Sequence, residues 1–213
     1  TGMHAEWCMK CLDAGKPVLC EKPMSVHRRE AEQVFRAFED KGLLISEAYM
    51  YLYHPLNLRV KSLVESGRIG QLCSLQATFN VCLEPGDFRF RKDMGGGALL
   101  DLGCYCVGIM RMVAGAEPVE TRALFKIGSE SQVDESVAGC LQFPGGVLGS
   151  FSCGLKSEFE INYEVYGSEG KIKVGKAGMI AWPGEDHTID VWSGGEHEAI
   201  KIPDTDQIGR AHV

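Results

Sequence analysis

Short apolar runs alternate with helical patterns at the start of the chain. Apolar or small residues recur at helical spacing over residues 4–14 and stop at Gly15, a residue type that commonly ends helices. The apolar run 18–20 follows, then a second helical pattern over 26–40 and a second apolar run over 43–46. Helix, strand, helix and strand with short joints are typical of the second half of a doubly wound parallel sheet.

Two strands and two helices leave much of a parallel sheet uncovered. One sheet edge and a large apolar surface would face water, which a stable domain avoids. We therefore expect residues 1–48 to be the C-terminal part of a dinucleotide-binding Rossmann domain, whose front part precedes Thr1.

The pattern changes at Gln71, after a helix predicted over residues 55–65. Alternating residues and tight turns then predict strands of an antiparallel sheet, interrupted by one helix over 98–114 that follows a triglycine. The predicted strands cover residues 73–83, 121–128, 136–143, 147–155, 161–166, 171–174, 188–192 and 198–202. The fold class is therefore an α/β Rossmann remnant plus an α+β domain, residues 49–213, with a large, mostly antiparallel open sheet.

Strict alternation of apolar and polar residues in 150–155 and 161–166 adds a detail to this sheet. Such alternation indicates that helices cover one face of the sheet. The same alternation predicts that the opposite face of the sheet is open to a partner.

Composition excludes several classes of partner. The 213 residues are 45% hydrophobic and 24% charged, with a net charge of -7, as in an ordinary globular protein. The 22 Lys and Arg residues are scattered, which disfavours nucleic acid and anionic membranes as partners. No apolar run approaches the roughly 20 residues that span a bilayer, and the first residues lack a secretory pattern, so a cytoplasmic location is expected.

The nine cysteines are expected to be reduced thiols. Five of them stand inside apolar runs and are predicted to be small buried side chains: Cys20, Cys73, Cys82, Cys140 and Cys153. Cys8 and Cys11 have the spacing of half a zinc site, but no second pair follows them, so no metal is predicted.

Lys22, Asp101 and Tyr105 are the candidate catalytic residues. Lys22 follows the strand 18–20 at its carboxyl end, where open parallel sheets bind ligands. Asp101 and Tyr105 are four residues apart on one helix face, and the preceding triglycine allows close backbone approach to a ligand. Taken singly, a solvated loop lysine and a hydrogen-bonded helical pair are the simpler interpretations. Together they suit alcohol oxidation, with Tyr105 as base, Lys22 lowering its pKa, and Asp101 binding a substrate hydroxyl or orienting Lys22.

Several blocks in order carry a resemblance to a known family. They are AGKPVLCEKP at residues 14–23, AYMY at 48–51 with His54-Pro55, SGRIG at 66–70, and GGGALLDLGCY at 95–105. The chain resembles, nearly end to end, the glucose-fructose oxidoreductase, inositol dehydrogenase and rhizopine-catabolism (Gfo/Idh/MocA) oxidoreductases. The resemblance implies NAD or NADP as cofactor and a sheet that packs against another subunit in dimers or tetramers.

The resemblance also implies roles for single residues. Lys22 matches the family's catalytic lysine, and Asp101 and Tyr105 match its active-site helix. Glu21 matches a residue beside the nicotinamide. Weaker matches on the cofactor side are His4, Trp7 and Arg89, whereas His54 is expected to have a structural role. Many relatives have histidine at the position of Tyr105. The tyrosine of this chain resembles other branches of the family, which implies an aldose, a cyclic polyol or a diol as substrate.

One departure from the family is clear: no G-x-G-x-x-G loop occurs in these residues. The resemblance implies that this loop precedes Thr1 and that relatives continue beyond Val213, so we expect truncation at both ends and an inactive fragment when isolated.

The predicted function is NAD(P)-dependent hydride transfer at a hydroxyl of a sugar, polyol or cyclic diol. The alternative is an inactive fragment or a sheet-mediated assembly module derived from that family.

Overall fold

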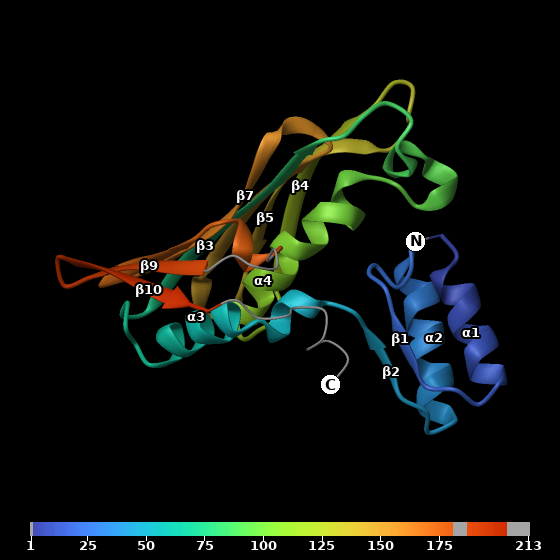
Figure 1. Cartoon of the computed structure of the whole chain (residues 1–213), viewed down its shortest axis with the longest axis horizontal. Coiled ribbons are helices and arrows are strands. Elements are labelled where there is room, and N and C mark those ends of the chain that lie inside the picture. Colours follow the sequence, from blue (N-terminus) through green and yellow to red (C-terminus); the bar gives the residue numbers. More distant parts are fainter. Residues whose placement is uncertain (1, 181–186, 204–213) are drawn as a thin grey trace.

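A computed structural model describes residues 2–180 and 187–203. Its first part is a two-stranded parallel sheet of β1 (Val18–Cys20) and β2 (Ile45–Glu47), in which Cys20 pairs with Glu47. Helices α1 (His4–Asp13) and α2 (Arg28–Asp40) lie together on one side of it (Figure 1). The predicted order of helix, strand, helix and strand is confirmed, and the second helix begins two residues later than expected.

The second part is one sheet of eight strands, in the order β10-β9-β8-β7-β3-β6-β5-β4. All neighbours are antiparallel except β3 and β6, so the sheet is mostly antiparallel, as predicted. The strands are β3 (Leu72–Cys82), β4 (Glu120–Ile127), β5 (Asp134–Gln142), β6 (Leu148–Gly154), β7 (Lys156–Gly167), β8 (Gly170–Val174), β9 (His187–Ser193) and β10 (Glu196–Ile202).

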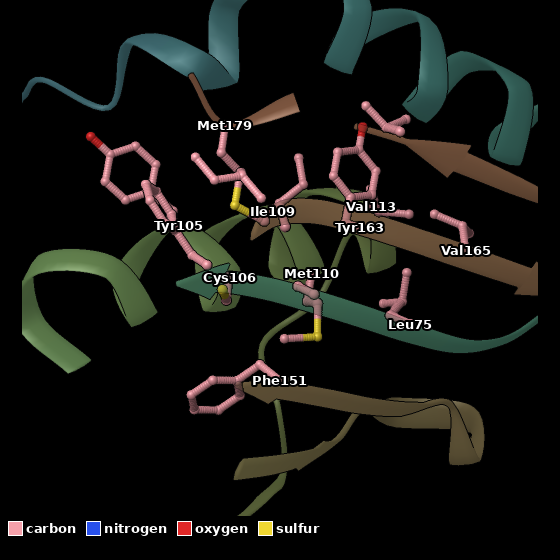
Figure 2. Packing of buried hydrophobic residues seen from close by; sticks show 14 of the residues in the cluster. Leu75, Tyr105, Cys106, Ile109, Met110, Val113, Phe151, Tyr163, Val165 and Met179 are labelled. Carbon is pink, nitrogen blue, oxygen red and sulfur yellow. The ribbon is translucent and has the colours of Figure 1, made fainter. Parts of the chain in front are cut away.

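Helices cover one face of this sheet. Helix α3 (Pro55–Glu65) packs near β9, and α4 (Cys104–Ala114) packs on β3 and β6 (Figure 1). The core between helices and sheet contains Leu75, Ile109, Tyr163 and other buried residues (Figure 2). A second, smaller core joins α1, α2 and β1. The predicted division of the sheet into a covered and an open face is therefore confirmed.

The predicted burial of five cysteines is only partly correct. All nine thiols are free, and Cys20 and Cys153 are buried, but Cys73, Cys82 and Cys140 are exposed. Cys82 and Cys140 alternate with core residues and so point to the open face. Cys73 lies at the register shift at the start of β3. An apolar run did not reveal which face each thiol occupies.

The helix predicted over residues 98–114 has two parts. Its first turns, Leu99–Gly103, form a π-helix, and α4 follows directly. By length and mean hydropathy alone, the segment Lys92–Ala114 could cross a bilayer, which the lengths of the apolar runs did not indicate. Half of its most apolar window is buried inside the protein, as in the core helix of a globular domain.

Candidate active site

Lys22 connects the small sheet to the large domain. It stands just past the carboxyl end of β1, and its ammonium donates to the backbone oxygen of Asp101 at 2.6 Å and to carboxylate Oδ1 at 2.9 Å. The Lys22 side chain is only 13% exposed. A charge-assisted pair with so little access to water is held in a defined geometry. The two residues that the sequence placed near one crevice are thus in direct contact.

Asp101 is shared by two cations. Its second carboxylate oxygen accepts a hydrogen bond from Arg89 Nε at 2.7 Å, and Arg89 is also paired with Asp87 at 3.1 Å. Burial tends to lower the pKa of Arg89, but the two carboxylates outweigh it and raise that pKa. Asp101 therefore contacts both Lys22, which it was expected either to orient or to leave for a substrate hydroxyl, and Arg89, which the sequence suggested only through a weak match.

Tyr105 lies under Lys22 at one end of the core. The phenol is 5% exposed, and the Lys22 ammonium lies 4.8 Å from the centre of its ring. Figure 2 shows its hydroxyl pointing away from Cys106 and Ile109. Burial raises the pKa of Tyr105, and the nearby Asp101 and Glu21 raise it further. The lowered pKa expected from the sequence is not found, because the loss of water on burial outweighs the lowering effect of the nearby Arg89.

These side chains line one pocket of about 310 Å³. Lys22, Arg89, Asp101 and Tyr105 form its polar end. The rest of the lining is apolar and consists of Phe79, Val81, Leu83, Leu102, Phe159 and Ile180. Cations, a carboxylate and a neutral phenol that converge in a pocket can bind the oxygen of an alcohol or carbonyl and exchange a proton with it.

The triglycine before this helix has a structural reason. A side chain on Gly96 would overlap the carbonyl of Arg89, and one on Gly97, whose φ is +122°, would overlap the Asp134 carboxylate. The Asp134 carboxylate in turn accepts a hydrogen bond from Leu99 N at 2.7 Å. The glycines therefore permit close packing that fixes the start of the helix bearing Asp101.

Sequence reasoning missed two carboxylates near the site. Asp134 fixes the active-site helix from β5, and no local pattern marked it. Glu47 ends β2 and accepts a hydrogen bond from Met24 N at 2.6 Å, which holds the loop that follows Lys22. Burial raises the pKa of Glu47. The rule about carboxyl ends of parallel strands, applied to the strand 45–47, would have identified it.

The other predicted residues lie at different distances from this pocket. His4 Nδ1 lies 2.8 Å from the carbonyl oxygen of Pro23, beside the Lys22 loop. Glu21 is exposed, and Trp7 is 54% exposed, with Lys10 over its ring. His54 is buried and accepts a hydrogen bond from Leu56 N at the start of α3, consistent with a structural role. Among residues 2–180 and 187–203, no cluster of side chains suits a metal ion.

The edge of the small sheet fits the nicotinamide end of a dinucleotide. Ligands of parallel sheets bind beyond the carboxyl ends of the strands. There Lys22 stands just past the end of β1, Glu47 ends β2, and Lys22 lines the pocket. His4, through Pro23, belongs to the same edge.

Comparisons with known proteins identify the family of the chain. The family model of the GFO/IDH/MocA C-terminal domain matches residues 57–173, and that of the oxidoreductase family with an NAD-binding Rossmann fold matches residues 1–49. The chain is 35% identical over 171 residues to dTDP-3,4-didehydro-2,6-dideoxy-alpha-D-glucose 3-reductase of Actinomadura kijaniata, which covers 80% of the chain and 52% of the relative.

Two further relatives extend the comparison. Trans-1,2-dihydrobenzene-1,2-diol dehydrogenase of Macaca fuscata fuscata is 35% identical over 167 residues, 78% of this chain and 50% of its own. The crystal structure of a 3-ketoreductase from Actinomadura kijaniata with NADP and TDP-benzene superposes with a TM-score of 0.91 at 30% identity, over 99% of this chain and 65% of that one. The chain spans about half the length of the curated relatives it matches. By its sequence and its fold, the chain belongs to the GFO/IDH/MocA family of oxidoreductases.

Proposed function

We propose that the protein is an NAD(P)-dependent oxidoreductase acting on a hydroxyl, or the corresponding carbonyl, of a sugar, polyol or cyclic diol. The observation that carries the proposal is the contact of Lys22 with Asp101 above the buried Tyr105. Relatives named for sugar 3-reduction and for diol dehydrogenation support the substrate class. In this proposal residues 1–48 belong to the dinucleotide-binding domain, and residues 49–213 form the substrate and oligomerisation domain.

Each polar residue of the pocket has a distinct task in this proposal. A bound nicotinamide supplies or accepts the hydride at carbon. Lys22 donates a hydrogen bond to the substrate oxygen, which stabilises negative charge on it. Asp101 positions Lys22 and Arg89. Tyr105 exchanges the proton with that oxygen, and Glu21 and His4 adjoin the nicotinamide side of the site.

The pH dependence of reduction tests the role of Tyr105. A phenol must be protonated to donate, and an unperturbed phenol loses its proton near pH 10. Because burial raises the pKa of Tyr105, the protonated donor persists as pH rises through that value. We expect kcat/KM for carbonyl reduction not to fall through a phenol ionisation between pH 7 and 10.

A Tyr105→Phe variant completes this test. It removes the hydroxyl and keeps the ring contacts with Tyr51 and Phe79, whose centroids lie 5.0 Å and 5.3 Å away. We expect at least about a hundredfold loss of turnover, the usual scale for proton-transfer catalysis. The matched control is Tyr166→Phe, far along the open face on β7. Full activity of Tyr105→Phe, or a fall in the wild-type rate below pH 9 that vanishes in this variant, would contradict the assignment.

The open sheet face supports homo-oligomerisation as part of the proposal. Small neutral side chains occupy its centre: Thr78 of β3 pairs with Ser152 of β6, and Ser152 with Ala138 of β5. This central part of the face can pack closely against a second copy, because the side chains of Thr78, Ser152 and Ala138 carry no charge to desolvate. The partner is thus proposed to be the same protein, as a dimer or tetramer.

An arginine at the centre of this face tests the oligomer. Ser152→Arg places two like charges against each other across a two-fold interface. We expect at least about a hundredfold weaker self-association by light scattering coupled to size exclusion. Ser129→Arg, in an exposed turn, is the control and should not change the mass. A monomeric wild type, or an unaltered oligomer in Ser152→Arg, would exclude this face.

A further inference from the structure

The hydrogen-bonding groups of the pocket lie at one end and are largely committed to each other. Lys22 directs two of its hydrogen bonds to Asp101, and the Asp101 carboxylate accepts from both Lys22 and Arg89. A ligand therefore meets a third donor on Lys22 and the hydroxyl of Tyr105, with little acceptor capacity left on Asp101. This end can satisfy one or two oxygen atoms of a substrate.

The rest of the pocket lining is apolar and forms a carbon wall. Phe79 and Val81 project from alternate positions of β3, on the face that the helices cover, and Leu83 directly follows the strand. Phe159 adjoins them from β7, beside the register shift between Asn80 and Cys82, and remains 50% exposed. Among the described residues, those that line this side of the pocket bring no polar side chain to it.

This asymmetry determines which ring fits. A substrate hydroxyl turned toward the carbon wall loses water and gains no partner, at a cost of about 1–3 kcal/mol in proteins. Apolar pockets discriminate against an added hydroxyl by about a hundredfold. A ring with oxygen on every carbon meets this penalty at several positions, whereas a ring with oxygen on one edge avoids it.

We propose that the pocket selects a ring whose oxygen functions stand on adjacent carbons at one edge, with only carbon and hydrogen at the edge that meets the apolar lining. An alicyclic vicinal diol or a deoxygenated sugar ring meets this description, and a fully hydroxylated cyclic polyol does not. The inference rests on the proposed function and narrows its substrate class.

A diol and a hexol on the same cyclohexane ring test the inference. With the full-length protein and NAD or NADP, trans-cyclohexane-1,2-diol should give a kcat/KM at least about a hundredfold above that of myo-inositol. Equal values, or a preference for myo-inositol, would overturn the inference and leave the proposed function intact. If neither is oxidised, binding of both compounds, followed by saturation-transfer NMR, still decides the selectivity of the pocket, and the proposed function is then judged by turnover of a sugar.

Substitutions on the wall locate the cause of the selectivity. Val81→Thr keeps the side-chain shape and adds a hydroxyl, and it should lower the ratio of the two kcat/KM values by about tenfold. Val119→Thr is the matched control on an exposed site, 67% exposed, and should keep the wild-type ratio. Phe159→Asn, at a half-exposed position, provides a second wall variant if Val81→Thr is poorly folded. If folded wall variants keep the wild-type ratio of the two kcat/KM values, the apolar wall is not the cause of the selectivity.

Discussion

Replacing Lys22 with alanine is expected to lower kcat/KM of the full-length enzyme by at least about a hundredfold. The change removes the cation that lies 2.9 Å from the Asp101 carboxylate and 4.8 Å from the Tyr105 ring centre. It also leaves Asp101 paired with Arg89 alone, so the remaining carboxylate no longer directs a donor at the substrate oxygen. The measurement is steady-state turnover of a vicinal diol and reduction of its ketone.

A matched lysine separates this role from general electrostatics. Lys171 also places its ammonium over an aromatic ring, 4.7 Å from the centre of Trp192, but it lies on β8 outside the pocket. Lys171→Ala should retain wild-type turnover. Lys22→Arg should restore the charge without the original geometry and recover little activity, because a planar guanidinium does not replace a compact ammonium. Turnover of Lys22→Ala within threefold of wild type would contradict the proposed site.

The position of this site followed from short-range patterns. The rule that ligands bind at the carboxyl ends of parallel strands identified Lys22, and helical spacing brought Asp101 and Tyr105 to one region. Both rules depend only on backbone geometry, which local sequence determines well. The helix over residues 55–65 was predicted with its observed bounds for the same reason, since Pro55 begins it and Ser66-Gly67 follows it.

Properties that depend on the packed interior were not predicted. The raised pKa of Tyr105 arises mainly from its burial, which no spacing of residues reports. Asp134 reaches the active-site helix from a strand more than 30 residues away in sequence, so it had no local signal. The exposure of Cys82 and Cys140 depends on which face of the sheet is covered by α3 and α4. These features require long-range contacts, and a single sequence does not specify them.

The substitution Asn57→Ala is expected to lower the free energy of unfolding by about 3 kcal/mol. Asn57 is fully buried in α3, and its amide donates to the carbonyls of Tyr51 and Gly178 at 2.8 Å and 2.7 Å. Its oxygen accepts from the buried hydroxyl of Tyr163 at 2.7 Å. Alanine leaves that hydroxyl and the Gly178 carbonyl without these partners. Denaturant unfolding of the purified chain, followed by circular dichroism, measures the change.

A double-mutant cycle shows whether the unpaired hydroxyl is the cause. Tyr163→Phe alone should cost about 1 kcal/mol, because it removes one hydrogen bond. In the Asn57→Ala background, the same substitution should cost almost nothing, since it removes a buried hydroxyl that already lacks its acceptor. The control Gln33→Ala, at an exposed position of α2, should stay within about 0.5 kcal/mol of wild type. Additive effects of the two core substitutions would mean that Asn57 stabilises the fold by filling space, and not by joining α3 to β7 through Tyr163.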